Sequence, residues 1–87
     1  MHKIELPEDY ALVLQQVDEN GTEELSNLAE SLRFDRARLV HIVRALRNKG
    51  LIVTQRAGED MRIRLSAKGH QLLTYIWPQA QAGWQGA

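Results

Sequence analysis

Hydrophobic residues recur along this chain with two different spacings. Spacing of i, i+3, i+4 and i+7 marks the buried side of a helix, whereas alternation with a period of two marks a half-buried strand. The first spacing predicts helices over about residues 7–19, 23–32 and 36–49. The second predicts a hairpin over residues 51–65, and a return to helical spacing predicts a last helix over residues 66–78.

Residues with known preferences for helix ends support these boundaries. Pro7 suits the first turn of the first helix, and Asn20-Gly21 is a stop signal. We expect Thr22 to cap the second helix, with Glu23 and Glu24 in its first turn, and Asp35 to cap the third. Gly50 closes the third helix, and Ser66 and Pro78 delimit the last.

The third helix has one apolar side and one polar, mostly basic side. With about 100° between successive residues, Leu39, Ile42, Val43 and Leu46 fall within a single arc. The positions opposite this arc, or on its flanks, are Ala37, Arg38, Val40, His41, Arg44, Ala45, Arg47 and Asn48. We therefore expect this helix to present a basic surface to solvent.

Apolar and polar residues alternate along the two expected strands of the hairpin, which a loop at residues 57–60 joins. This alternation predicts one apolar and one basic face. The expected apolar face consists of Leu51, Val53, Met61, Ile63 and Leu65. The expected outer face consists of Ile52, Thr54, Arg56, Arg62 and Arg64. Because neighbouring like charges destabilise a hairpin, three arginines side by side favour an anionic partner over a purely structural role.

The 87 residues are expected to form one domain, residues 1–87, with a strong internal charge asymmetry. The whole chain has a formal net charge of zero, and 44% of its residues are hydrophobic. Residues 1–32 contain one lysine and eight acids, a net charge of −7, whereas residues 33–68 contain ten lysines and arginines and three acids, a net charge of +7. Such a distribution suits a protein that presents one face to a polyanion.

Several classes of function lack support in the sequence. No apolar run is long enough for a membrane span, and the N-terminus does not resemble a signal peptide, so we expect a cytoplasmic protein with no membrane partner. There is no cysteine, the three histidines have no metal-ligand spacing, and no catalytic set or phosphate-binding glycine loop is present. We therefore expect no enzyme activity, metal or cofactor.

The order helix, turn, basic helix, hairpin predicts a winged helix-turn-helix. This fold is mainly α with a small β hairpin: a three-helix core, a two-stranded wing and a short C-terminal helix. The helix-turn-helix would span about residues 23–49 and the wing residues 51–65.

Three motifs add a family resemblance covering roughly half of the chain. They are Leu28-Ala29-Glu30, Lys49-Gly50-Leu51-Ile52 and Leu65-Ser66-Ala67-Lys68-Gly69. Together they resemble the winged-helix core of the MarR-type transcriptional regulators, which implies a prokaryotic DNA-binding regulator of transcription. One departure is Arg33, where the family usually has glycine in the turn; it predicts either a left-handed arginine or a different turn.

The resemblance and the helical angles together suggest the DNA-binding residues. A recognition helix contacts base edges with its outer face and phosphates with its flanks. From the helix the candidates are Ala37, Arg38, Val40, His41, Arg44 and Arg47, and from the wing Arg56, Arg62 and Arg64. Arg38 or Arg44 would read guanine, Val40 or Ala37 would contact a thymine methyl group, and the wing arginines would contact the DNA backbone.

The expected partner is double-stranded DNA, together with a second copy of the chain. The terminal helices and Trp84 are candidates for a homodimer contact, and we expect the tail, residues 79–87, to be flexible. The alternative is a winged-helix protein-interaction module without DNA binding, whose basic face meets an acidic partner or the acidic half of another copy.

Overall fold

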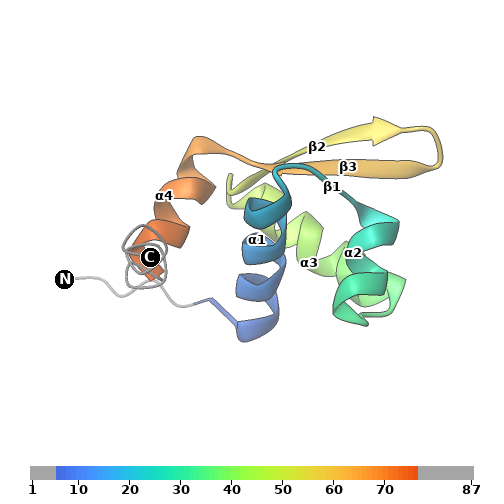
Figure 1. Ribbon diagram of the computed structural model, residues 1–87, viewed down its shortest axis with the longest axis horizontal. Helices are drawn as coiled ribbons and strands as arrows, with labels where there is room; N and C mark the ends of the chain where they lie inside the picture. Colours follow the sequence, from blue (N-terminus) through green and yellow to red (C-terminus); the bar gives the residue numbers. More distant parts are fainter. Residues whose placement is uncertain (1–5, 77–87) are drawn as a thin grey trace.

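A three-stranded antiparallel sheet lies along one side of the helices in the part of the chain that the computed structural model describes, residues 6–76 (Figure 1). The elements are α1 (Glu8–Asn20), β1 (Glu23–Glu24), α2 (Leu25–Leu32), α3 (Arg36–Asn48), β2 (Ile52–Ala57), β3 (Asp60–Leu65) and α4 (Ala67–Ile76). The predicted winged helix-turn-helix is confirmed. The tail and Trp84 lie outside the described residues. No helix within residues 6–76 combines the length and hydrophobicity that crossing a membrane requires.

The strand β1 was not predicted, and it makes the wing a three-stranded sheet in the order β1-β3-β2. Glu23 pairs with Ile63, and Glu24 pairs with Arg62. The prediction that Thr22 caps a helix beginning at Glu23 is wrong. Glu23 and Glu24 form the strand β1, and α2 begins only at Leu25. The side chain of Glu24, the N-cap residue of α2, forms no capping hydrogen bond.

Glu23 is buried where β1 meets the C-terminal end of α1. Its side chain is only 6% exposed, on the same face of the sheet as Ile63. Asn20 donates a hydrogen bond to its Oε2, whereas Oε1 has no hydrogen-bond partner among residues 6–76. The carboxylate is therefore only half satisfied.

Every described helix and both long strands contribute to one hydrophobic core. The apolar arc predicted for α3 is confirmed, since Leu39, Ile42, Val43 and Leu46 are all buried. The other core residues are Val13, Leu14, Val17, Leu25, Leu28, Leu51, Ile52, Ile63, Leu65, Leu72 and Leu73.

Both ends of α3 are fixed by caps that the sequence predicted. The Asp35 carboxylate accepts a hydrogen bond of 3.0 Å from the Arg38 backbone N–H. At the other end the N–H of Gly50 donates to Arg47 O (2.9 Å), and the N–H of Leu51 donates to Leu46 O (3.0 Å). This pair of bonds is a Schellman motif, with Gly50 at φ +77° in the left-handed position.

The carbonyl groups that follow α3 are hydrogen-bonded by the beginning of α4. The Ser66 hydroxyl donates to Gly50 O (2.6 Å), and the Ser66 N–H donates to Leu51 O (3.0 Å). The Lys68 ammonium donates to Lys49 O (3.1 Å). Ser66 also caps α4 as predicted, because its Oγ accepts a bond of 3.0 Å from the Gly69 N–H. This α3–α4 junction closes the base of the hairpin.

The hairpin register corrects the predicted assignment of its faces. Paired residues of antiparallel strands share a face, and Ile52 pairs with Leu65 whereas Val53 pairs with Arg64. Ile52 is therefore buried and Val53 exposed, the reverse of the prediction. The reason is that Leu51 precedes the strand as part of the α3 cap, so that two consecutive residues are buried before the alternation begins.

We predict that Gly69→Ala destabilises the domain, although alanine ordinarily favours a helix. A Cβ at Gly69 would lie 2.1 Å from Leu51 O, whose position the Ser66 N–H fixes. We expect a loss of about 1–3 kcal/mol, as for other overpacked sites. Thermal unfolding measures it, with Gln71→Ala on the exposed surface of α4 as the control; a Gly69→Ala melting temperature at or above that of the control would contradict the close approach.

Arg33 ends α2 in the left-handed conformation, with φ +60°. The Phe34 N–H donates to Ala29 O (3.1 Å), so a tight turn forms here without a glycine. Of the two alternatives for this position, the left-handed arginine is the one observed. A residue with a Cβ pays a conformational cost there that glycine does not.

Arg33→Gly should therefore raise the free energy of unfolding. We expect a gain of about 0.5–1 kcal/mol. This is the cost of the left-handed conformation for a residue with a Cβ, minus the extra conformational entropy that glycine loses on folding. Chemical denaturation measures the change. Arg33→Ala is the matched control because it removes the same charge but keeps the Cβ; equal stability of the two variants would show that charge, not backbone strain, sets the difference.

Candidate nucleic-acid interface

The outward side of α3 carries an exposed polar strip. Ala37, His41, Arg44 and Asn48 lie opposite the buried arc and are exposed, and we call them the reading strip. Val40 and Arg47 lie on the flank towards the sheet, where Val40 is half-buried and Arg47 exposed. Five of the six α3 residues predicted to meet DNA thus lie on the strip or on this flank; the sixth, Arg38, is on the other flank.

A groove of roughly 140 Å³ separates this flank of α3 from the sheet. Apolar side chains form much of its wall, and Arg44 and Arg47 supply its positive charges. Its lining residues are Leu25, Val40, Val43, Arg44, Arg47, Thr54 and Met61. Within residues 6–76 neither Arg44 nor Arg47 forms an ion pair. Both guanidinium groups therefore keep their capacity to bind an anion.

Arg56 lies on the same face of the wing as this groove. It pairs with Met61, and Thr54 lies two residues before it, so all three share one face of the hairpin. Met61 and Thr54 line the groove, so Arg56 continues its wall towards the hairpin turn. The α3 strip and Arg56 therefore belong to one continuous side of the molecule.

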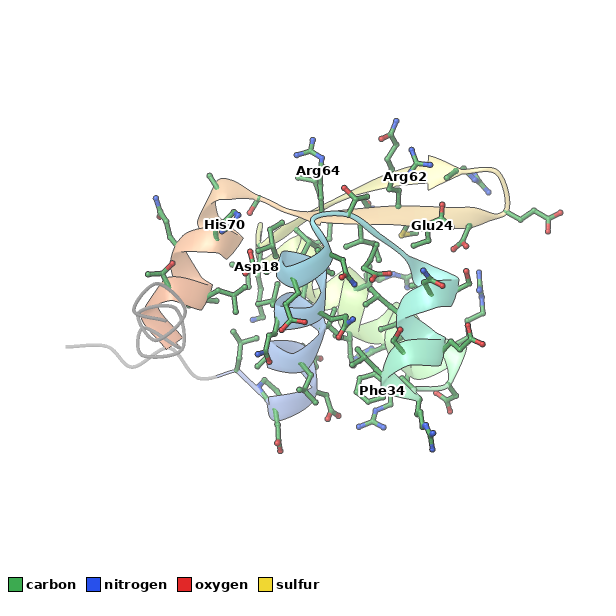
Figure 2. All side chains as sticks on the ribbon, in the orientation of Figure 1. Asp18, Glu24, Phe34, Arg62, Arg64 and His70 are labelled. Atoms are coloured by element: carbon green, nitrogen blue, oxygen red, sulfur yellow. The ribbon has the colours of Figure 1, made fainter. Side chains whose placement is uncertain are left out.

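Arg62 and Arg64 lie on the opposite face of the sheet, and the prediction that the three wing arginines lie side by side is wrong. They pair with Gln55 and Val53, which alternate with Thr54 and Arg56. In Figure 2 both side chains point away from the helices. Arg62 Nη2 lies 3.7 Å from Glu24 Oε2, and Arg64 stands beside the exposed Val53.

Arg38 is held on the flank of α3 that faces α1. Its Nη2 donates a hydrogen bond to the Asp9 carboxylate, and its guanidinium carbon lies 4.4 Å from the centre of the Phe34 ring. Phe34 lies at the turn between α2 and α3 (Figure 2). In the isolated domain Arg38 is therefore engaged by its own chain rather than aligned with the reading strip.

The charge asymmetry of the sequence is partly neutralised within the fold. Within residues 6–76 two ion pairs join the acidic N-terminal part to the basic part: Asp9 with Arg38, and Glu24 with Arg62. Asp18 also lies 3.5 Å from His70 in α4. Arg44, Arg47 and Arg56 take no part in them. The side of the molecule that carries the groove thus keeps these three positive charges.

Sequence reasoning missed the residue that fastens the wing to α2. Asp60 Oδ1 accepts hydrogen bonds from the backbone N–H groups of Ser26 (3.2 Å) and Met61 (2.8 Å), and its Oδ2 accepts one from the Ser26 hydroxyl (2.5 Å). A side chain from the wing thus caps α2, which lacks a cap of its own. Because Asp60 and Ser26 are 34 positions apart, no local pattern could reveal this contact.

The same hydrogen bonds alter the titration of Asp60. The Ser26 hydroxyl, then the Met61 N–H, lower the pKa of this carboxyl below 3.8. Desolvation opposes them, and the Ser26 N–H and Arg36 lower the pKa further. The charged form is therefore favoured in the folded state.

Comparison with solved structures places this chain among winged-helix proteins. A MarR variant from E. coli complexed with operator DNA superposes with a TM-score of 0.80 at 14% identity, covering 85% of this chain and 55% of the other. AbsC, a MarR family transcriptional regulator from Streptomyces coelicolor, superposes with a TM-score of 0.79 at 20% identity, covering 88% of this chain and 55% of AbsC. A MarR family protein from Bacillus stearothermophilus superposes with a TM-score of 0.79 at 19% identity, covering 95% of this chain and 59% of the other.

These likenesses concern the fold. The chain spans a little over half the length of the structures that it matches. No protein-family model matches the sequence, and no curated protein matches it either. The winged-helix architecture predicted from the sequence is thus the one found in the MarR-type regulators.

Replacing Asp60 with asparagine should lower the melting temperature, by an amount that depends on pH. Because the folded-state pKa lies below the ordinary value of 3.8, the stabilisation is fully present above that value and is lost as the pH falls through the folded pKa. We expect the gap between wild type and Asp60→Asn to be constant from pH 7 to about 5 and to close below 3.8. Thermal melts across this range measure it, and a gap that widens in acid would contradict the assignment.

Proposed function

We propose that this domain binds duplex DNA and regulates transcription, with α3 in the major groove. The observation that carries the proposal is the exposed reading strip on α3: Arg44 on the strip and Arg47 beside it have no acidic partner in residues 6–76. The major groove, about 12 Å wide, admits one α-helix, and the buried arc of α3 leaves only this side of it accessible.

Within the proposed complex the residues of α3 have distinct roles. Arg44, on the reading strip, is the candidate for a bidentate contact with guanine. His41 and Ala37 precede it on the same strip, and Ala37 or the half-buried Val40 would meet a thymine methyl group. Arg47, on the flank towards the sheet, would bind a backbone phosphate.

Of the predicted wing contacts we retain Arg56 for the same duplex. It lies on the face of the hairpin that continues the groove beside α3, so its guanidinium group would follow the DNA backbone from the recognition helix. We propose no contact with this duplex for Arg62 and Arg64, because they lie on the other face of the sheet. The DNA-binding face is therefore narrower than the sequence suggested.

The structural neighbours support this proposal at the level of the fold. One of them was solved with operator DNA, and two others belong to the MarR family, one of them a transcriptional regulator. These are properties of those proteins; the proposal extends DNA binding and regulation to this chain because the exposed cations lie on its recognition helix.

We expect Arg44→Ala to weaken binding to a random duplex by several-fold at moderate salt, since it removes a positive charge from the face that meets the DNA. Arg47→Ala should weaken binding and make the slope of log K against log salt shallower by about 1. Fluorescence anisotropy with a labelled duplex measures both. Arg64→Ala removes the same charge from the opposite face and should cost much less; equal losses in all three variants would contradict a specific interface on α3.

The wild-type domain should lose affinity as salt is added. The two proposed backbone contacts, Arg47 and Arg56, predict a slope of about −2 for log K against log salt, because each neutralised phosphate releases about 0.9 counterion. A salt titration of the same anisotropy signal gives the slope. Binding that hardly changes between low and moderate salt would overturn the proposed function and favour a protein partner.

A further inference from the structure

Arg38 is bound between an acid and an aromatic ring that come from two different elements. Asp9, in the first turn of α1, accepts a hydrogen bond from its guanidinium group. Phe34, in the turn before α3, lies against the same group at 4.4 Å, within the range of a cation–π attraction. Asp9 and Phe34 together therefore hold the Arg38 side chain towards α1.

The position of this contact matters because it lies at the N-terminal end of α3. Asp35 caps the backbone N–H of Arg38 at 3.0 Å, so the Cα of Arg38 is fixed in the first turn of the helix. In helix-turn-helix proteins the N-terminal residues of the recognition helix contact the bases, while neighbouring residues contact the backbone. Asp9 consequently brings a negative charge close to the path that a DNA phosphate would take.

The contact between Asp9 and Arg38 is also one that a phosphate can replace. The side chains are 37% and 50% exposed, respectively, so water and salt reach both charges. Exposed ion pairs of this kind are weak, whereas the arginine fork binds phosphate oxygens in pairs. Neither Asp9 nor Arg38 belongs to the hydrophobic core, so Arg38 can leave Asp9 without disturbing the fold.

We infer that Asp9 competes with the DNA backbone for Arg38 and so lowers the affinity of the domain for any duplex. The inference rests on the proposed DNA-binding function and adds a regulatory residue outside the helix-turn-helix. In the free domain Arg38 neutralises Asp9; on DNA Arg38 turns to a phosphate and leaves Asp9 to solvent. Because breaking the Asp9–Arg38 contact opposes a contact with the DNA backbone, Asp9 lowers non-specific binding and leaves the base contacts of Arg44 unchanged.

The test compares Asp9→Asn with Glu8→Gln on a random duplex, by anisotropy with a salt titration. Asp9→Asn releases Arg38, so we expect binding tighter by roughly two- to fivefold and a slope steeper by about 1. Glu8 is exposed, lies in the same first turn and has no ion pair within residues 6–76. Its substitution removes the same charge without releasing an arginine, so we expect a smaller gain and an unchanged slope.

A double variant decides whether the effect passes through Arg38. In an Arg38→Ala background Asp9→Asn should give only the small gain expected of Glu8→Gln and leave the slope unchanged, and thermal melts verify that each variant is folded. If the gain in the wild-type background only equals that of Glu8→Gln, or if it is the same with and without Arg38, the inference is overturned in favour of a general charge effect. Arg44→Ala is measured in the same assay. If Arg44→Ala weakens binding but Asp9→Asn does not strengthen it, the role of Asp9 is overturned and the proposed function stands. Absence of binding in every protein overturns the proposed function as well.

Discussion

The path of the chain as it leaves α3 constrains the rest of this structure. The N–H groups of Gly50 and Leu51 bind the last carbonyls of α3. The carbonyls that follow α3 accept hydrogen bonds from Ser66 and Lys68, at the end of the hairpin, and Gly69 permits this close approach because it has no side chain. The junction thereby sets where β2 leaves α3, where β3 ends and how α4 packs, and so orients the wing relative to the recognition helix.

The sequence was most informative where a single element determines its own structure. The apolar arc of α3, its Asp35 cap and its Gly50 end depend on residues within one or two turns, and all three were predicted correctly. Such features have a periodicity or a residue preference that the sequence displays directly. The order of these elements predicted the fold, and the family resemblance agreed with it.

The sequence was least informative where elements distant in the chain meet. The strand β1 exists because β3 offers it backbone partners, and Asp60 caps a helix 34 positions away. The hairpin faces were reversed in β2 because Leu51 belongs to the helix cap, which displaced the alternation by one residue. Arg38 was placed by helical angle on the flank of α3, but only the fold shows that Asp9 stands beside it.

The half-satisfied carboxylate of Glu23 bears on the motions of the sheet. Burying a polar oxygen without a hydrogen-bond partner costs free energy, and Glu23 belongs to a strand of only two residues. Segments that combine short pairing with an unfavourable buried group are the first to open in native-state fluctuations. The edge of the sheet at β1 is thus the part of the wing whose backbone amides would exchange with solvent before the paired core of β2 and β3.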